Sequence, residues 1–317
     1  MVCIMEWYHT LLIVISLIII LIFITSYVCF RLTFYSKNKL ILDKDEIVIP
    51  DDKFYRKFKN VIIDDIKYSR SLEFKEYSIK SFDGLTLYAK YYECIKGAPI
   101  EIMFHGYKGN AERDLSTGIK RAFRCNRNVL LVDQRASGKS EGKVITFGIN
   151  ESKDCVKWAE FASKEFGEDV KIILTGVSMG AATVLIASSL DLPKNVVGVI
   201  ADCGYNKASD IIKKVIKEMK LPASIFYPFE RIGARIFGHF KLEETSPYES
   251  VKNSKIPTIF LHGDADSLIP CDMSLKLYIA CTSKKRLVTI NGAEHGVSYL
   301  EDPEKYINEL NDFFNYL

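Results

Sequence analysis

The sequence is short of the features that mark nucleic-acid-binding proteins and metalloproteins. Its 43 basic and 40 acidic residues leave a net charge of +3, and no basic run interleaved with aromatic residues occurs, so we expect no nucleic-acid partner. The eight cysteines are scattered, and no two have C-x-x-C spacing, which argues against a zinc site and a thioredoxin-like motif. We therefore expect no metal and no cofactor, and we interpret most cysteines as buried thiols.

Long hydrophobic runs are also rare, and the one that stands out lies near the N-terminus. Residues 11–30 carry no charged side chain and would extend about 30 Å as a helix, the thickness of a bilayer's hydrocarbon core. A cleaved signal peptide is the main alternative, but no basic segment precedes the run and no A-x-A site follows it. We predict that residues 1–30 form a single-pass membrane anchor, rather than a signal peptide or a buried core helix.

Basic residues flank this run only on its C-terminal side, at Arg31, Lys37 and Lys39. The positive-inside rule then slightly favours a cytoplasmic position for the domain that follows, although short single-anchor proteins can break the rule. Residues 31–72 are charged and mixed in character. We interpret them as a juxtamembrane connector with some helix, for which a solvated linker is an equal alternative.

The remaining chain has the pattern of an α/β protein. Two alternating segments joined around Asp83-Gly84 predict an antiparallel hairpin. Apolar runs then alternate with helical patterns, which is typical of a mostly parallel sheet covered on both faces. We predict one α/β domain over residues 73–317. The expected strands are 73–81, 85–92, 100–104, 128–132, 171–175, 196–201, 258–261 and 287–290, and the expected helices are 111–125, 151–166, 181–190 and 303–317.

More than 50 residues separate the strand that ends at Ala201 from the strand that begins near Ile256, which is too many for a plain connection. We predict an inserted helical cap at about residues 205–250. Its aromatic residues would hold an apolar part of a substrate, with ordinary packing onto the sheet as the alternative. These residues are Phe226, Tyr227, Phe229, Phe237 and Phe240, and they follow a helix face that is rich in lysine.

The segment Gly176-Val177-Ser178-Met179-Gly180 joins an apolar run to a segment of small and apolar residues. A strand–turn–helix of this kind exposes a serine hydroxyl above a sheet, and its glycines let strand and helix approach closely. The pattern alone is weak, because chance supplies it in about one chain of this length in ten, and Ser178 would otherwise be an ordinary helix N-cap. We predict that Ser178 is a nucleophile.

Histidine is scarce, which narrows the choice of the base that a serine nucleophile needs. Of five histidines, His295 lies in a loop directly after the last expected strand, where a positioned base belongs in an open α/β sheet. We predict that His295 is this base, with His239 in the insertion as a distant second.

The acid that orients this histidine is expected at the end of a strand. The loop after strand 258–261 offers Asp266, with Asp264 as the alternate and Asp202 as a weaker one. Each would otherwise be a turn-capping aspartate. The resulting order of Ser178, Asp266 and His295 is that of α/β-hydrolases.

An acyl-transfer site also needs hydrogen-bond donors for an oxyanion. The backbone N–H of Met179, directly after the serine, is the first donor that we expect. The loop after strand 100–104 should supply the second, and we assign it to the backbone N–H of Tyr107. A plain glycine turn is the alternative for this loop.

Five motifs carry a family resemblance: residues 105–107 (HGY), 133–140 (DQRASGKS), 176–180 (GVSMG), 262–266 (HGDAD) and 294–296 (EHG). With them the chain resembles the α/β-hydrolase superfamily over about residues 73–317. It is most similar to the bacterial membrane-anchored group of the Bem46 and S33-type serine aminopeptidase hydrolases. The family's H-G-x-x-D pattern implies that Asp266 is the acid. Ser137 stands where the family often has histidine, so we expect contacts with the substrate to differ there.

We therefore predict a membrane-anchored serine hydrolase that cleaves an ester or related acyl bond through an acyl-enzyme, in the manner of a carboxylesterase or lipase. Its substrate would be a small-molecule or lipid-like acyl compound. The alternatives are a peptidase of the S33 type, a catalytically silent binding protein with the same fold, and a membrane-tethered protein that binds a partner through the lysine face of the insertion. The sequence does not indicate an oligomeric state.

Overall fold

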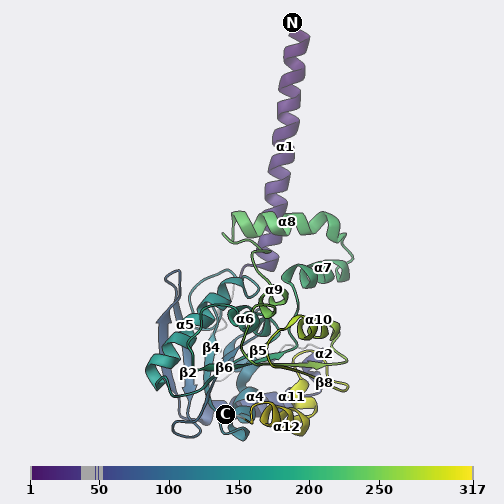
Figure 1. The fold of residues 1–317 in the computed structure, drawn as a ribbon. Helices are drawn as coiled ribbons and strands as arrows, with labels where there is room; N and C mark the ends of the chain where they lie inside the picture. Colours follow the sequence, from purple (N-terminus) through teal and green to yellow (C-terminus); the bar gives the residue numbers. More distant parts are fainter. Residues whose placement is uncertain (1, 37–46, 48, 50–52, 316–317) are drawn as a thin grey trace.

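The structure, a computed structural model, describes residues 2–36, 47, 49 and 53–315. Its centre is an eight-stranded sheet in the order β1-β2-β4-β3-β5-β6-β7-β8 (Figure 1). The strands are β1 (Lys75–Lys80), β2 (Thr86–Tyr92), β3 (Ile100–Phe104), β4 (Asn128–Asp133), β5 (Ile172–Val177), β6 (Val196–Asp202), β7 (Thr258–Gly263) and β8 (Lys285–Ile290).

The strand pairing confirms the predicted fold class. β1 and β2 form the antiparallel hairpin, and β2 pairs antiparallel with β4. The other neighbouring strands are parallel. β3 and β7 are buried along their whole length, which explains why they are mostly apolar and do not alternate strictly with polar residues.

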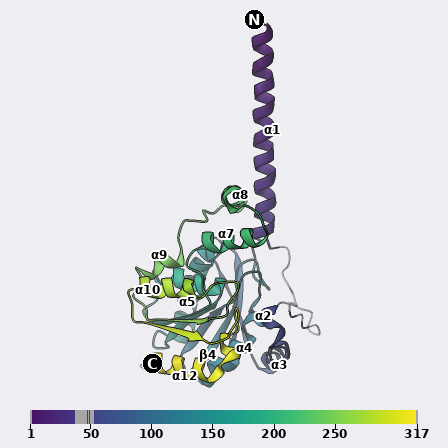
Figure 2. The same cartoon turned by 90° about the vertical axis from the view of Figure 1, so that its right-hand side faces the viewer.

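Helices cover both faces of the sheet (Figures 1 and 2). One face carries α5 (Ile149–Phe166), α6 (Met179–Ala187), α9 (Pro247–Val251) and α10 (Asp272–Ala280), and the other carries α3 (Lys59–Ser71), α4 (Ala111–Arg124), α11 (Ser298–Glu301) and α12 (Pro303–Phe313). The sequence analysis missed α10, because that segment has no clear amphipathic period, and it missed the single turn α11. It also ended β7 two residues early and began β8 two residues late.

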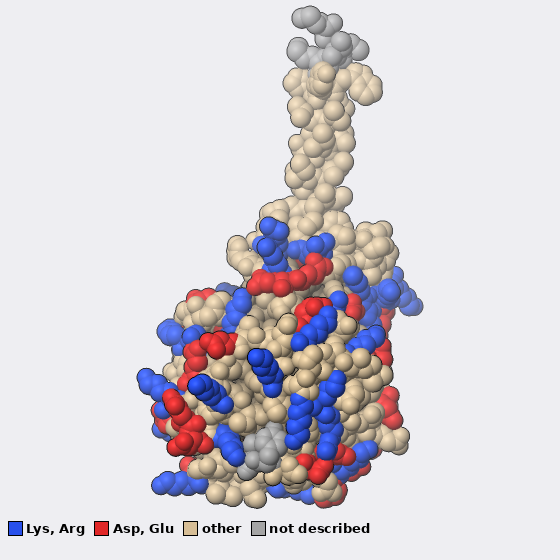
Figure 3. Space-filling view, in the orientation of Figure 1, with Lys and Arg blue, Asp and Glu red and all other residues tan. Residues whose placement is uncertain are grey.

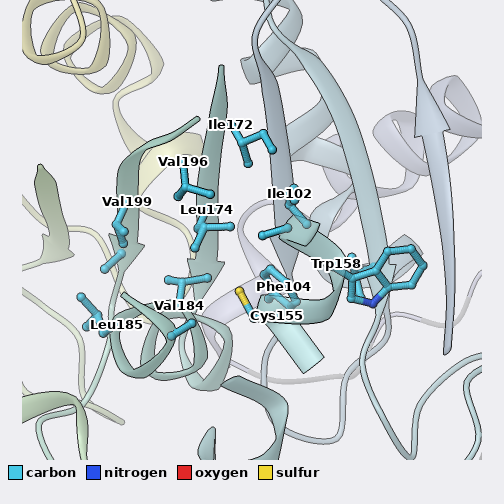
Figure 4. Close-up of a cluster of buried hydrophobic side chains, with 14 of the residues drawn as sticks. Ile102, Phe104, Cys155, Trp158, Ile172, Leu174, Val184, Leu185, Val196 and Val199 are labelled. Carbon is cyan, nitrogen blue, oxygen red and sulfur yellow. The ribbon is translucent and has the colours of Figure 1, made fainter. Parts of the chain in front are cut away.

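The main core lies between the sheet and the helices α5 and α6. Trp158 of α5 and Val184 of α6 are fully buried there against the strands. Figure 4 shows this cluster around Leu174 and Phe104. Close packing of these side chains fixes α6 on the sheet, and the first residue of α6 directly follows Ser178.

The N-terminal helix α1 (Val2–Thr33) extends away from the sheet (Figure 1). Its segment Trp7–Thr33 is long and apolar enough to cross a membrane. Residues 31–72 also contain α2 (Lys53–Arg56) and α3, whereas residues 37–46, with Lys37 and Lys39, lie outside the described residues.

The predicted insertion is helical, and two of its aromatic residues pack on α1 and on the residue that follows it. It contains α7 (Ala208–Glu218) and α8 (Ala223–Ile236). The ring of Phe237, at the end of α8, lies 5.0 Å from that of Phe23 and 5.1 Å from that of Tyr27, while Phe240 packs on Phe34 at 5.3 Å. The base of α1 is therefore part of the packing of this insertion.

Glu230 of α8 is buried at this junction. Its Oε1 accepts a hydrogen bond from the Thr33 hydroxyl at 2.9 Å, and its Oε2 has no partner among the described residues. Burial raises the pKa of Glu230 to about 7, and the hydrogen bond from Thr33 only partly opposes this rise. A carboxyl in this position favours its protonated form.

Replacing Glu230 by glutamine should remove a pH-dependent loss of stability. The pKa of Glu230 is higher in the folded state than in the unfolded state. Its contribution to the free energy of unfolding is therefore fully present below about pH 4.5 and is lost as the pH rises through 7, a change of about 3 kcal/mol. In detergent, the melting temperature of the wild type relative to Glu230→Gln should therefore fall between about pH 5 and 8. The exposed neighbour Glu218 provides a control, and the wild type measured against Glu218→Gln should show no such trend. A difference from Glu230→Gln that is constant with pH would contradict the prediction.

Candidate active site

The serine motif forms a sharp turn between β5 and α6. Ser178 has φ 57° and ψ −117°, a strained backbone that L residues rarely adopt, and its N–H donates to the Asp202 carbonyl at 2.9 Å. A Cβ on Gly176 would lie 2.1 Å from the Gly180 oxygen, and a Cβ on Gly180 would lie 2.0 Å from the Phe104 oxygen. Only glycine at these two positions allows strand and helix to pack this closely.

The structure brings the predicted nucleophile, base and acid together in one hydrogen-bonded chain. The Nε2 atom of His295 lies 3.0 Å from the Ser178 Oγ. Its Nδ1 atom lies 2.8 Å from the Asp266 Oδ2. An ionised carboxylate only accepts, so Nδ1 carries the proton and Nε2 is free to accept from the serine. All three side chains are buried.

Asp266 is held ionised by its surroundings. Burial raises the pKa of its carboxyl, but hydrogen bonds from His262 and His295 outweigh this effect and lower the pKa to about 2. Its Oδ1 also accepts the backbone N–H groups of Leu268 and Ile269, at 3.0 and 2.8 Å. The carboxylate therefore has a fixed orientation as well as a fixed charge. His262, whose Nε2 lies 3.2 Å from Asp266, is a contact that the sequence analysis did not assign.

The alternative residues have other partners. Asp264 accepts the Gly292 N–H at 2.7 Å, as a turn-capping aspartate would. Asp202 accepts the hydroxyls of Ser298 and Tyr306, both at 3.0 Å. His239 is exposed beyond the end of α8.

The loop 105–109 lies against Ser178 on one side and against the end of α1 on the other. A Cβ on Gly106 would lie 3.6 Å from the Ser178 Cβ. The Tyr107 hydroxyl donates to the Thr33 carbonyl at 2.6 Å, and the Lys108 ammonium donates to the Leu32 carbonyl at 2.7 Å. These carbonyls are at the C-terminus of α1, where a helix has unpaired acceptors. The loop that we expect to hold an oxyanion is thus tied to the N-terminal helix.

Residues of the five family motifs also hydrogen-bond to the loop 105–109. His105 is buried, and its carbonyl accepts the Gln134 side-chain amide at 2.7 Å. The Ser137 hydroxyl donates to the Gly109 carbonyl at 2.5 Å. Ser137, which stands where the family often has histidine, therefore supports the loop through a hydrogen bond from its hydroxyl.

A cavity of about 300 Å³ opens beside Ser178 and His295. Its apolar lining includes Met103 of β3 and Leu115 of α4, and it extends along the face of the sheet that α4 covers. The connector forms part of its wall: Phe54 of α2 packs edge-on against His295, with ring centroids 5.9 Å apart. The sequence analysis missed Phe54 and its neighbour Tyr55 because a charged, mixed segment gave no sign of where it would fold.

The insertion does not supply this cavity's wall. Among the described residues that line the cavity, none belongs to 205–250. The prediction that the aromatic insertion holds the substrate is therefore not supported, and Phe237 and Phe240 pack instead on α1 and on Phe34.

One group beside the site has the residue types of a metal centre. Ligand atoms of Cys203, Asp266 and His295 lie within 4.8 Å of one another. Metal ligands must be deprotonated and free to coordinate, yet both nitrogens of His295 make hydrogen bonds to Asp266 and Ser178. Burial also raises the pKa of the Cys203 thiol well above its usual value. These atoms fit a hydrogen-bonded chain better than a metal centre.

Comparison with known proteins places this arrangement in a family. The sequence profile of the prolyl oligopeptidase family matches residues 146–317, more than half of the chain. The chain belongs to the prolyl oligopeptidase family. The matched region contains all three residues of the hydrogen-bonded chain, whereas the loop 105–109 lies before it.

The chain is also similar to individual proteins. The chain is similar to the uncharacterized protein YqkD of Bacillus subtilis (strain 168), with 26% identity over 189 residues that cover 59% of this chain and 62% of YqkD. It is also similar to protein bem46 of Schizosaccharomyces pombe, with 24% identity over 251 residues and 77% of both chains covered. The resemblance to Bem46-like α/β-hydrolases is thereby confirmed.

A solved structure shows the same fold. The esterase Pf2001 of Pyrococcus furiosus superposes with a TM-score of 0.65 and 23% identity, over 78% of this chain and 93% of that one. The fold and the membership of the prolyl oligopeptidase family together identify the protein as an α/β-hydrolase.

Proposed function

We propose that the protein is a serine hydrolase that cleaves a carboxylic ester, with Ser178 as nucleophile, His295 as base and Asp266 as the acid that orients it. The observation that carries this proposal is the unbroken chain from the Ser178 Oγ through His295 to Asp266, at 3.0 and 2.8 Å. A serine at a strained turn with a positioned base is the arrangement that activates a hydroxyl for attack on an acyl carbon.

The reaction would proceed through an acyl-enzyme. His295 accepts the Ser178 proton at Nε2 while Oγ bonds to the carbonyl carbon, and Asp266 stabilises the imidazolium that forms. The N–H groups of Met179 and Tyr107 would bind the resulting oxyanion. As the intermediate collapses, the alcohol leaves with the proton from His295. Water, deprotonated by His295, then attacks the ester of Ser178; the acyl–Oγ bond breaks, His295 returns the proton to Oγ, and the carboxylic acid is released.

The cavity limits the size of the substrate group that it can hold. A volume of about 300 Å³ is at the lower end of the range for ligand pockets, about 300–1,000 Å³. We infer that an acyl or alcohol group of modest size occupies it, against Met103 and Leu115. A long lipid chain would have to extend past Phe54 into solvent.

A series of p-nitrophenyl esters tests this proposal. The purified full-length protein should hydrolyse them with saturation kinetics, and the specificity constant should be highest for short to medium acyl chains. A steady rise of this constant to the longest chains would contradict the cavity assignment. Failure of the folded protein to turn over any ester would contradict the esterase proposal itself.

Replacing Tyr107 by phenylalanine should slow catalysis without weakening substrate binding. The change keeps the backbone N–H but removes the hydroxyl that donates to the Thr33 carbonyl, so the loop loses a support of about 1 kcal/mol. Because oxyanion contacts act mainly in the transition state, kcat should fall by about fivefold to tenfold while KM stays nearly constant. Tyr77→Phe, which removes a hydroxyl bond to Glu165, should leave both constants unchanged. A rise in KM alone in Tyr107→Phe would contradict this role.

Cleavage of peptides is the second candidate, and the prolyl oligopeptidase family membership favours it. The same serine chemistry acts on amides, whose leaving amine must take the proton from His295. Turnover of p-nitroanilides of short peptides, measured beside turnover of p-nitrophenyl esters, distinguishes the peptidase from the esterase. We expect ester turnover to exceed anilide turnover, and the reverse ranking would favour the peptidase.

We further propose that α1 anchors the protein in a membrane as a single-pass helix, with residues 31–72 as connector and 73–317 as the hydrolase domain. The exposed apolar surface from Trp7 to Ile24 supports this, because water would be a poor solvent for it. Arg31 at the base of α1 slightly favours a cytoplasmic hydrolase domain.

A further inference from the structure

The helix α8 has a second apolar face. Ile225, Phe229, Ile232 and Ile236 recur at intervals of four, three and four residues, so they form one stripe along the helix. Ile225 and Ile236 are 56% and 45% exposed. The buried residues of α8, which include Tyr227 and Ala234, lie on the opposite side of the helix.

Contacts on the other sides of α8 show which way this stripe faces. On the buried side, Tyr227 lies against Lys213 of α7, with the ammonium 4.4 Å from the ring centre. On one flank, Gly233 lies so close to α1 that an added Cβ would be 2.5 Å from the Ser26 oxygen. Figure 2 shows α8 end-on, with α7 and the sheet below it and α1 extending past it. The stripe therefore faces the side toward which the free part of α1 extends.

The length of α1 determines where a bilayer would end. From Trp7 to Ile24 the helix is exposed, a length of about 27 Å, and the hydrocarbon core of a bilayer is about 30 Å thick. A bilayer that covers this segment therefore reaches the level of Phe23 and Tyr27, where Phe237 packs on α1. Trp7 and Tyr27 then lie at the two interfaces, where aromatic residues are preferred.

Charge around the stripe suits an anionic lipid surface. Residues 208–237 contain six basic and three acidic residues, and one of the acidic residues is the buried Glu230. Arg231 and Arg235 are exposed beside the stripe. Glu243 pairs with Arg231 at 2.9 Å. Figure 3 shows basic side chains around the base of the stalk formed by α1. Basic residues near a membrane surface are attracted to anionic headgroups.

We propose that α8 is an interfacial helix that lies in the headgroup layer of the bilayer crossed by α1, with its stripe against the acyl chains. This inference rests on the membrane anchor of the proposed function. Exposed apolar residues on one face with arginines beside them are the pattern of helices that lie in an interface. The insertion thus acts as a membrane-binding surface that fixes the orientation of the hydrolase domain.

Quenching of tryptophan fluorescence by brominated lipids tests the proposal in the full chain. The native tryptophans are Trp7 and the fully buried Trp158. In a Trp7→Phe background, Ile225→Trp and Ile236→Trp place a reporter on the stripe. Ile279→Trp is the matched control, because Ile279 is 67% exposed on α10 of the domain body. Each variant is reconstituted into phosphatidylcholine–phosphatidylglycerol vesicles, with and without bromine on the acyl chains.

We expect bromination to reduce the added emission of Ile225→Trp and Ile236→Trp by about twofold or more, and that of Ile279→Trp by nothing measurable. Equal and negligible quenching at all three positions would overturn the proposal. So would a blue-shifted but unquenched emission at positions 225 and 236, which would indicate that a second copy of the chain covers the stripe.

The native Trp7 separates this inference from the anchor on which it rests. Its emission is the difference between the wild type and Trp7→Phe. Quenched Trp7 with unquenched stripe variants would refute the interfacial helix alone, whereas unquenched Trp7 would refute the anchor.

Discussion

Replacing Ser178 by alanine should lower kcat for ester hydrolysis by about 10⁶-fold, to the level left by binding and oxyanion contacts. The substitution removes the atom that would bond to the acyl carbon, and no other described hydroxyl shares its contact with His295 at 3.0 Å. Because alanine occupies less space and Ser178 makes no side-chain cap, the fold should persist. Steady-state turnover of a p-nitrophenyl ester measures the loss.

A serine on the same helix segment provides the control for this variant. Ser189 follows α6, and among the described residues its hydroxyl bonds only to the Ile186 carbonyl, at 2.9 Å. Ser189→Ala should keep wild-type turnover. Residual activity of Ser178→Ala within tenfold of the wild type would assign the hydrolysis to another group.

Replacing Asp266 by asparagine should lower kcat by about 10⁴-fold, the loss that this replacement causes in serine proteases. The amide cannot stabilise an imidazolium, and it can donate to Nδ1 of His295 and so favour the wrong tautomer. The wild-type carboxylate has its pKa lowered to about 2, by hydrogen bonds from His262 and His295 that outweigh burial. Its charge should therefore be present over the whole working range of pH.

Asp264→Asn is the matched control, two residues away in the same loop. Asp264 accepts only the Gly292 N–H among its described hydrogen bonds, and an asparagine oxygen can do the same. Its kcat should stay within a few-fold of the wild type. If Asp264→Asn were the more damaging variant, the assignment of the acid would have to be exchanged.

The sequence predicted most of the fold because its signals were local. The central strands β3, β4, β5 and β6 are buried on both faces, so each is a mostly apolar segment of five to seven residues, and Asp83-Gly84 marks the hairpin. The sharp turn at Ser178 was predictable for a related reason. Gly176 and Gly180 are required there, because an added Cβ at either position would lie about 2 Å from a backbone oxygen. Such constraints are visible in the residue type itself.

The choice among the aspartates was less certain from the sequence. Asp264 and Asp266 lie in one loop, and only three-dimensional geometry shows that Asp266 points to His295 at 2.8 Å while Asp264 caps a turn. The family's H-G-x-x-D pattern supported the choice of Asp266 that the position of the loop had already favoured. The catalytic roles of these residues remain the proposal that the variants test.

The cavity wall and the role of the insertion could not be predicted, because both depend on long-range packing. Phe54 reaches His295 across more than two hundred residues of sequence. Phe237 of the insertion packs on α1, and a sequence pattern does not say which of two apolar surfaces a phenylalanine will meet. Phe237 against Phe23 is the clearest case.

The N-terminal helix α1 supports both the loop 105–109 and the insertion. Tyr107 and Lys108 hydrogen-bond to the last carbonyls of α1, and α8 packs on the same helix. Removing α1 to obtain a soluble fragment would free this loop and expose the flank of α8. Activity measurements therefore belong to the full-length protein in detergent or lipid.

Labelling with a fluorophosphonate tests the central claim most directly, because this probe forms a stable adduct only with a serine activated by a neighbouring base. The full-length wild type should be labelled at Ser178, as located by peptide mass spectrometry, and Ser178→Ala should not be labelled. Absence of an adduct on correctly folded wild type, or an adduct that persists in Ser178→Ala, would contradict the assignment of Ser178 as the nucleophile.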